Sequence, residues 1–197
     1  MSGPTISFLV PTHRPDRPLA RCLDSIAPQL RKGDEVIVIG DTHDGAMPSV
    51  KELVKSYGSK FRYIAHDAGS HDYGHSQLNC GLSLAKGDYV HCNDDDDVWT
   101  EGAVEAMRAA AEADPGRPLL FRFQSYLGPI FWVERGLFAR NWIGGHCLVA
   151  PNLPGKVGQF APAYNGDFDM VETTLALHGG VGSAVWKEDV ICHARPS

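Results

Sequence analysis

The sequence has few cysteines, and their arrangement does not suggest cross-linking. Five cysteines are spread over 197 residues, an odd number, and no two of them form a Cys-x-x-Cys pair. A small domain held together by disulfides needs paired cysteines, so reduced thiols are the simpler interpretation. The first residues also lack the basic flank and apolar core of a signal peptide. We therefore expect a cytoplasmic protein.

Long hydrophobic runs and clusters of basic residues are missing as well. No apolar stretch approaches the ~20 residues that a membrane-spanning helix needs, so we expect no transmembrane segment. The net charge is -6 and no Lys/Arg-rich stripe is present, which argues against nucleic acid as a partner. Hydrophobic residues make up 43% and charged residues 21%, as is typical of globular proteins. Without repeats or linkers, residues 1–197 are expected to form a single domain.

The first hundred residues alternate β-prone runs with amphipathic segments. Strands are expected at 6–10, where Pro11 ends the run, and at 35–39, 61–65 and 88–92. Helices are expected between them, at 19–30, 48–57 and 76–85. Strands joined by helices of this length pair in parallel through right-handed crossovers. We therefore predict an α/β, Rossmann-like fold, with a mostly parallel central sheet and helices on both faces.

The second half mixes fewer helices with more strands. A helix is expected from Thr100, followed by strands at 119–126, 130–133 and 146–150. A Pro- and Gly-rich loop at 151–165 leads to a helix at 169–178 and a last strand at 185–193. Trp142 could offer a flat surface to a ring-shaped ligand, although burial in the core is the expected role of such a residue.

Four consecutive carboxylates, Asp94–Asp97, follow the fourth expected strand. Like charges this close repel one another, and a divalent cation bound by carboxylate oxygens would relieve the repulsion. In α/β sheets, ligands bind at the carboxyl ends of the strands, which is where this run would lie. A second interpretation stays open, in which the run is a solvated acidic turn that caps the following helix.

Six segments of the chain form a series of motifs. They are Ser7–Pro15, Arg21–Ile26, Glu35–Gly45, Leu78–Asp97, Val157–Phe160 and Gly166–Asp169. In this order and spacing they resemble family 2-type glycosyltransferases with the nucleotide-sugar-binding GT-A fold. The resemblance implies that residues 1–99 bind the nucleotide sugar and that residues 100–197 form the acceptor side. The chain departs from the family pattern at Gly40 and Gly166, where the family has carboxylates, and at Leu78, where it has Arg.

The resemblance implies a metal-dependent transfer of a sugar, with inversion, from a nucleotide-diphospho-sugar to an acceptor hydroxyl. The nucleotide is expected to be UDP, and the acceptor a glycan, lipid or protein. A divalent ion, Mn²⁺ or Mg²⁺, would act as a Lewis acid on the diphosphate. Asp96 is the implied direct ligand, while Asp94 contacts the ribose, the metal or a metal-bound water. His193 is the implied histidine ligand, and a tail histidine without a ligand is the alternative.

Four further residues are assigned to catalysis or to donor binding. Asp167 matches the catalytic base, which would take the proton of the acceptor hydroxyl, although it could instead cap the following helix. Asp41 is placed to accept a hydrogen bond from a base such as uracil, with turn formation as the alternative. Thr12 would line the same pocket through backbone groups, and Asn79 belongs to the donor site by the resemblance.

Two other functions remain open from the sequence. A nucleotidyltransferase or phosphohydrolase on a similar fold would need a Gly-rich phosphate loop with basic residues, which Arg14 and Arg17 match only in part. A non-catalytic nucleotide- or metal-binding protein would keep the Asp run without a working acceptor side. The loop His66–His75, with three histidines and two aspartates, is expected to lie over the diphosphate or the sugar.

Overall fold

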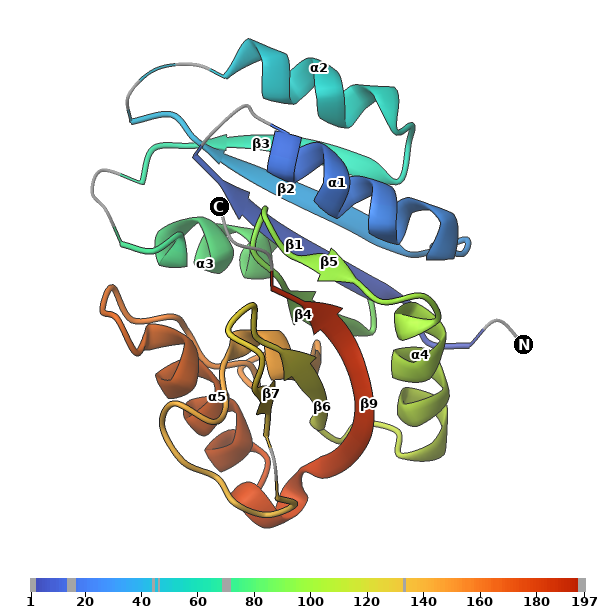
Figure 1. The fold of residues 1–197 in the computed structure, drawn as a ribbon, viewed down its shortest axis with the longest axis vertical. Helices are drawn as coiled ribbons and strands as arrows, with labels where there is room; N and C mark the ends of the chain where they lie inside the picture. The colour runs from blue at the N-terminus through green and yellow to red at the C-terminus, as the bar shows by residue number, and fades with distance from the viewer. Residues whose placement is uncertain are drawn as a thin grey trace.

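The structure is a computed structural model that describes residues 3–13, 17–43, 45, 47–68, 72–132 and 134–194 (Figure 1). Its strands are β1 (Ile6–Thr12), β2 (Glu35–Asp41), β3 (Phe61–His66), β4 (Tyr89–Cys92), β5 (Val98–Trp99), β6 (Leu119–Gln124), β7 (Ile130–Phe131), β8 (Leu148–Pro151) and β9 (Val185–His193). Its helices are α1 (Arg17–Ile26), α2 (Pro48–Ser56), α3 (His75–Leu84), α4 (Ala103–Ala113) and α5 (Gly166–Leu177), with 3-10 turns η1 (Ala27–Gln29), η2 (Gly145–Cys147) and η3 (Val181–Ser183). The predicted alternation of strands and helices in the first half is confirmed.

A single sheet runs through both halves of the described chain, in the order β3-β2-β1-β4-β8-β6-β9-β5, with β7 paired to β6. Strands β3, β2, β1 and β4 are parallel, and every residue of β1 is buried, as expected for a sheet covered on both faces. Helix α1 lies in front of β1 and β2 in Figure 1. Because the chain reverses direction across the sheet after β3, a right-handed crossover places α3 on the opposite face. The predicted α/β class is confirmed.

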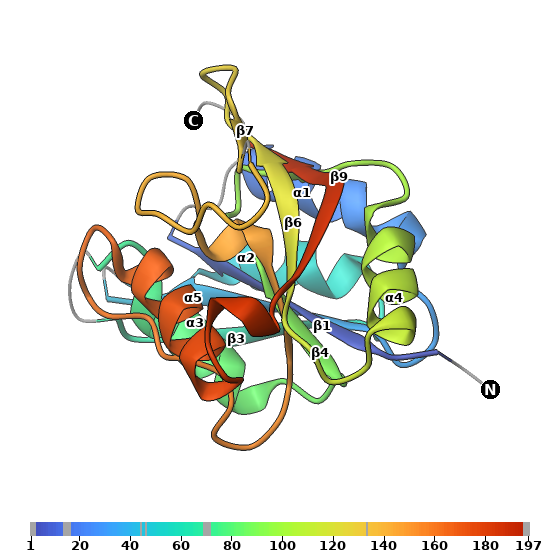
Figure 2. The same ribbon diagram turned by 90° about the horizontal axis from the view of Figure 1, so that it is seen from below.

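Beyond β4 the sheet changes character. Strand β8 runs antiparallel to β4 and to β6, and β5 runs antiparallel to β9, while β6 and β9 are parallel. Figure 2 shows this second part of the sheet, with β6 and β9 side by side and the β6–β7 hairpin extending away from the rest. Strand β4 therefore has a parallel neighbour on one side and an antiparallel neighbour on the other.

Two of the elements whose ends differ from the prediction bear on the site. Strand β1 continues through Pro11 to Thr12, because its pairing with β4 ends at Leu9 and only β2 lies alongside it beyond that point. A proline, which has no N–H to donate, is tolerated where a strand is bonded on one side. Helix α5 begins at Gly166 rather than at 169, so that Asp167 lies inside its first turn.

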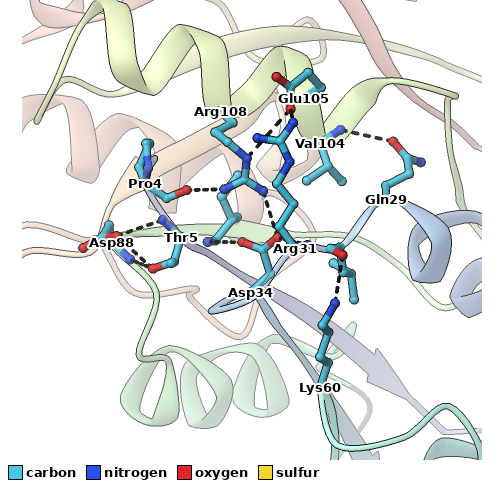
Figure 3. Close-up of polar contacts among 12 residues, drawn as sticks. Pro4, Thr5, Gln29, Arg31, Asp34, Lys60, Asp88, Val104, Glu105 and Arg108 are labelled. Carbon is cyan, nitrogen blue, oxygen red and sulfur yellow. Dashed lines mark hydrogen bonds and ion pairs between the residues drawn. The ribbon is translucent and has the colours of Figure 1, made fainter. Parts of the chain in front are cut away.

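A buried ion pair fastens α4 to the amino ends of β1 and β2 (Figure 3). The Asp34 carboxylate accepts hydrogen bonds from the N–H groups of Ile6 (3.0 Å) and Arg31 (2.7 Å), and from the Arg108 guanidinium (2.8 Å). Arg108 also donates to the carbonyl of Pro4. This network stabilises the end of the sheet opposite to the carboxyl ends of the parallel strands.

Thiols and helix lengths add two further observations. All five cysteines are free, and Cys80 is the one that is not fully buried. Among the described residues, no helix is long and apolar enough to cross a membrane.

Candidate functional site

The four consecutive aspartates leave the carboxyl end of β4 in different environments. Asp95 and Asp97 are buried, at 5% and 2% exposure, while Asp96 is half-buried and Asp94 is exposed. The hydroxyl of Thr12, at the end of β1, donates to Asp95 Oδ2 at 2.5 Å. Asp95 therefore joins the ends of two neighbouring strands, which leaves Asp94, Asp96 and Asp97 for other roles.

His146, in the turn η2 before β8, lies beside this run. Its Nε2 lies 3.2 Å from Oδ2 of Asp94 and 3.2 Å from Oδ2 of Asp97. Its ring stacks on Phe123, with centroids 4.8 Å apart. Because β8 runs antiparallel to β4, the turn η2 that precedes β8 lies beside the residues that follow β4. The sheet order thus brings His146 to the aspartates.

The charge state of His146 is set by these neighbours. Burial by itself lowers the pKa of the imidazole, but the carboxylates of Asp94 and Asp97 more than offset it, and its pKa lies well above the ordinary value. The imidazolium is therefore the cation between two carboxylates in this structure.

Among the described residues, Asp94, Asp97 and His146 are the set that brings three potential ligand atoms within 4.8 Å of one another. Two carboxylate oxygens and an imidazole nitrogen are ligands that suit Mn²⁺. Of the metal ligands predicted from the sequence, Asp94 belongs to this set. Asp96 and His193 lie outside it, although His193 pairs with Val98 and so lies near the run along the backbone. Their role as ligands stays a prediction.

Two cavities meet at this cluster. The smaller, of about 150 Å³, is bounded by Tyr73, His75 and Leu78 and by other residues. The larger, of about 500 Å³, is bounded by aromatic side chains of the second half of the chain, namely Phe123, Phe131 and Phe168. Both cavities share Asp94, His146, Tyr164 and Asp167 in their walls. The cluster therefore lies between a space next to α3 and a space built by the second half.

Asp167 reaches the same walls from the first turn of α5. Asn165 occupies the N-cap position, so Asp167 is not the cap of this helix. Its Oδ1 accepts the N–H of Phe168 at 2.7 Å. A Cβ added to Gly144 would lie 2.6 Å from its Oδ2, so the glycine leaves room for this carboxylate beside His146. The hydrogen bond from the Phe168 N–H thus fixes the position of Oδ1 of Asp167.

Two residues predicted to bind the nucleotide have structural partners at the ends of β1 and β2. Thr12 is buried, its hydroxyl bonds Asp95, and its carbonyl accepts from Gln77 at 2.9 Å. Asp41 Oδ1 accepts the backbone N–H groups of His43 (2.9 Å) and Ala68 (3.3 Å). Asp41 therefore orders a turn, the alternative left open by its sequence, and its contact with a base stays a prediction.

The side-chain amide of Asn79 hydrogen-bonds to the protein's own backbone. Its Nδ2 donates to the carbonyl of Phe160, and its Oδ1 accepts the N–H of the same residue, both at 2.9 Å. The side chain therefore holds the loop before α5 against α3. Donor binding by Asn79 stays a prediction.

Gly40 and Gly166 stand where the family has carboxylates. Aromatic residues occupy the space that a side chain at either position would need. A Cβ on Gly40 would lie 2.5 Å from the hydroxyl of Tyr63. A Cβ on Gly166 would overlap the carbonyl of Ala161 and lie 2.7 Å from the ring of His75. Both departures from the family pattern are thus built into the packing.

Sequence reasoning missed His146 as a partner of the aspartates. The contact of His146 with Asp94 depends on β8 lying next to β4, which no local pattern along the chain indicates. Trp142, expected in the core, is 38% exposed and its ring lies 6.3 Å from that of Phe131. The predicted roles of Arg14 and of part of the loop 66–75 lie outside the described residues, as does the side chain of Arg17.

Comparisons with known proteins place these features in a wider group. The family described as "Glycosyl transferase family 2" matches residues 7–169. An uncharacterised glycosyltransferase of Rickettsia prowazekii is 29% identical over 103 residues, which cover 52% of this chain and 30% of that protein. The glycosyltransferase GlyA of Streptococcus pneumoniae is 30% identical over 102 residues, which cover 52% of this chain and 14% of GlyA. The match thus spans less than a third of either relative's length.

The fold itself is similar to that of TarS from S. aureus. The crystal structure of TarS superposes with a TM-score of 0.75 at 17% identity, over 98% of this chain and 37% of TarS. TarS residues 1–349 have also been crystallised with UDP-GlcNAc, and that structure superposes with a TM-score of 0.70 at 17% identity over 98% of this chain and 59% of that one. The likeness confirms the GT-A fold predicted from the motifs.

Proposed function

Because the chain belongs to glycosyl transferase family 2, we propose that it transfers a sugar from a UDP-sugar to an acceptor hydroxyl, with inversion. The observation that carries this proposal is that Asp94, His146 and Asp167 line two adjoining cavities, with Asp97 beside Asp94 and His146. The complex of TarS with UDP-GlcNAc, a protein of similar fold, supports a nucleotide-sugar donor. In this proposal residues 1–99 hold the donor, and residues 100–197 form the acceptor side of a single domain.

We assign a divalent cation, Mn²⁺ in preference to Mg²⁺, to Asp94, Asp97 and His146. The donor set supports Mn²⁺, because imidazole suits it better than it suits Mg²⁺. When bound, such an ion supplies a Lewis acid to the diphosphate leaving group. The proton that His146 holds between the carboxylates must leave when the ion binds, because only the neutral imidazole is a ligand. Asp96 and His193 are the alternative ligands implied by the family motifs.

Asp167 is the proposed general base. With Oδ1 bonded to the N–H of Phe168, Oδ2 is the oxygen available to take the proton of an acceptor hydroxyl. An acceptor in the larger cavity would attack from the side opposite to the leaving diphosphate, and a single displacement of this kind inverts the anomeric centre. General base catalysis of this type contributes ~10²–10⁴-fold. The aromatic walls of the larger cavity would exclude bulk water from the acceptor.

Ligand binding tests the donor and the metal together. The melting temperature of the protein is measured with each of a panel of nucleotide sugars, with and without Mn²⁺. At least one nucleotide sugar is expected to raise it, and to raise it more when Mn²⁺ is present. Asp97→Asn and His146→Gln are expected to abolish the Mn²⁺-dependent part. The matched controls are Asp189→Asn, an exposed aspartate of β9, and His193→Gln. If His193→Gln abolishes the Mn²⁺-dependent rise in melting temperature and His146→Gln does not, His193 is the metal ligand in place of His146.

Catalysis is tested with the nucleotide sugar that binds best, by measuring the rate at which the nucleotide diphosphate is released. Asp167→Asn is expected to lower this rate by ~10²–10⁴-fold while donor affinity is kept. Asp169→Asn on the same helix is the control, because Asp169 pairs with Arg140 at the surface. A wild-type protein that binds the donor but never releases its sugar would instead be the non-catalytic binding protein.

A further inference from the structure

Two exposed tyrosines meet at the mouth of the smaller cavity. Tyr73 is 64% exposed and Tyr164 is 77% exposed, and their ring centroids are 6.0 Å apart with an edge-to-face geometry. They belong to the loops that precede α3 and α5, two helices that lie on the same side of the molecule in both views (Figures 1 and 2). Single exposed aromatic residues are common, but two from distant parts of the chain in contact over a cavity form a defined surface.

The backbone holds Tyr73 in a position that such residues rarely adopt. Its φ is 62°, and Asn141 is the other non-glycine residue with positive φ in the described ranges. Asparagine tolerates this conformation, whereas a tyrosine there is an outlier. Strain of this kind is typical of residues placed for a function. In this conformation Tyr73 lies in the wall of the smaller cavity.

Below the tyrosines the cavity has an aromatic floor. The ring of His75 stacks on Phe160, with centroids 5.5 Å apart, and lies 5.9 Å from the ring of Tyr73. His75 Nδ1 lies 2.6 Å from the carbonyl of Ala161 and donates a hydrogen bond to it, which fixes the ring. The absence of a side chain at Gly166 leaves the space that this ring needs. Several aromatic faces thus lie together in the wall of the cavity.

The same cavity also has polar residues in its wall. Asn93, Asp94 and Asp167 line it, together with His146. A ring-shaped ligand with one apolar face and a rim of hydroxyl groups would match both the aromatic and the polar residues. A pyranose has this character, since its axial C–H groups can pack on an aromatic face while its hydroxyls bond carboxylates and amides.

We infer that Tyr73 and Tyr164 form the wall against which the sugar ring of the nucleotide-sugar donor packs. The inference rests on the proposed function and extends it, because it assigns the smaller cavity to the donor sugar. The position of the cavity favours donor over acceptor, since α3 belongs to the nucleotide-binding half of the chain. The tyrosines are specificity residues in this assignment, and they take no part in proton transfer.

The test compares the affinity for a nucleotide sugar with the affinity for its nucleotide diphosphate alone. UDP-GlcNAc and UDP are the first probes, measured by calorimetry with Mn²⁺, and a panel of other nucleotide sugars follows if this pair does not bind. Tyr73→Ala and Tyr164→Ala are each expected to weaken binding of the nucleotide sugar about tenfold and to leave UDP binding unchanged. The phenylalanine variants keep the ring and are expected to bind like the wild type.

Tyr126→Ala is the matched control, because Tyr126 is 59% exposed on the β6–β7 hairpin and lines neither cavity. Substitution of such exposed side chains leaves the fold intact. Alanine variants that bind the nucleotide sugar as tightly as the wild type would overturn the inference, as would an equal loss of UDP binding. A folded wild type that binds no nucleotide or nucleotide sugar would defeat the proposed function itself, and this inference with it.

Discussion

Replacing His91 should change how the stability of the protein depends on pH. The imidazole of His91, on β4, is fully buried beside the rings of Phe8 and Trp99, and its Nδ1 lies 3.0 Å from the carbonyl of Leu148. Burial disfavours the charged form and lowers the pKa of His91 to about 4, from an ordinary value of 6.5. The folded protein therefore resists taking up a proton that the unfolded chain accepts.

The sign of the effect follows from this order of pKa values. At pH 7 both states are mostly neutral at this residue. As the pH falls through 6.5, the unfolded chain binds the proton first, so unfolding is favoured until the folded protein also binds it near pH 4. The gap between the two values corresponds to about 3 kcal/mol in total, of which about 2 kcal/mol is lost between pH 7 and pH 5.

Urea denaturation of the wild type and of His91→Phe at pH 7 and pH 5 measures this difference. Phenylalanine keeps the packing of the ring and cannot titrate, although loss of the bond to Leu148 costs about 1 kcal/mol at either pH. The variant should lose about 2 kcal/mol less than the wild type between the two pH values. His13→Phe, at an exposed position, controls for the removal of a histidine. Equal losses in wild type and His91→Phe would refute the reasoning from burial.

Two further substitutions test the frame of the protein, each with a control, by the free energy of unfolding in urea. Asp34→Ala leaves the buried guanidinium of Arg108 without its carboxylate and should cost about 3–5 kcal/mol, whereas Arg31→Ala, which breaks an exposed pair, should cost less than about 1 kcal/mol. Equal losses of stability in Asp34→Ala and Arg31→Ala would mean that the buried ion pair contributes no more than the exposed one. Gly166→Ala should destabilise the protein because its Cβ overlaps a backbone carbonyl, while Gly182→Ala has open space and should be nearly neutral.

The first half of the fold could be predicted because its signals are local. Strands such as β2 are continuous buried runs, and the connecting segments have helical periodicity, so parallel pairing followed from the alternation. Strand β5 has two residues, too few for any period to show. The passage of β1 through Pro11 depends on which neighbours lie beside each residue, and the sequence does not contain that information locally.

The candidate site was predictable only in part, for the same reason. Asp94 and Asp167 stand in motifs that can be recognised along the chain, and both lie in the walls of the cavities. His146 reaches Asp94 through the pairing of β8 with β4, which joins segments far apart in the sequence. No local pattern distinguishes Asp97 within the run Asp94–Asp97, and its burial beside β5 became evident only with the fold.

The two unlike neighbours of β4 have a consequence for how the protein opens. The parallel strands and the antiparallel strands are joined along β4, and the contact of His146 with Asp94 and Asp97 crosses that line. The His146 contact adds to the pairing of β4 with β8, and an ion at the proposed metal site would link the two parts of the sheet at the same point. We expect amide hydrogen exchange in β8 to slow when Mn²⁺ is added, because an ion held by Asp94, Asp97 and His146 would restrain β8 relative to β4.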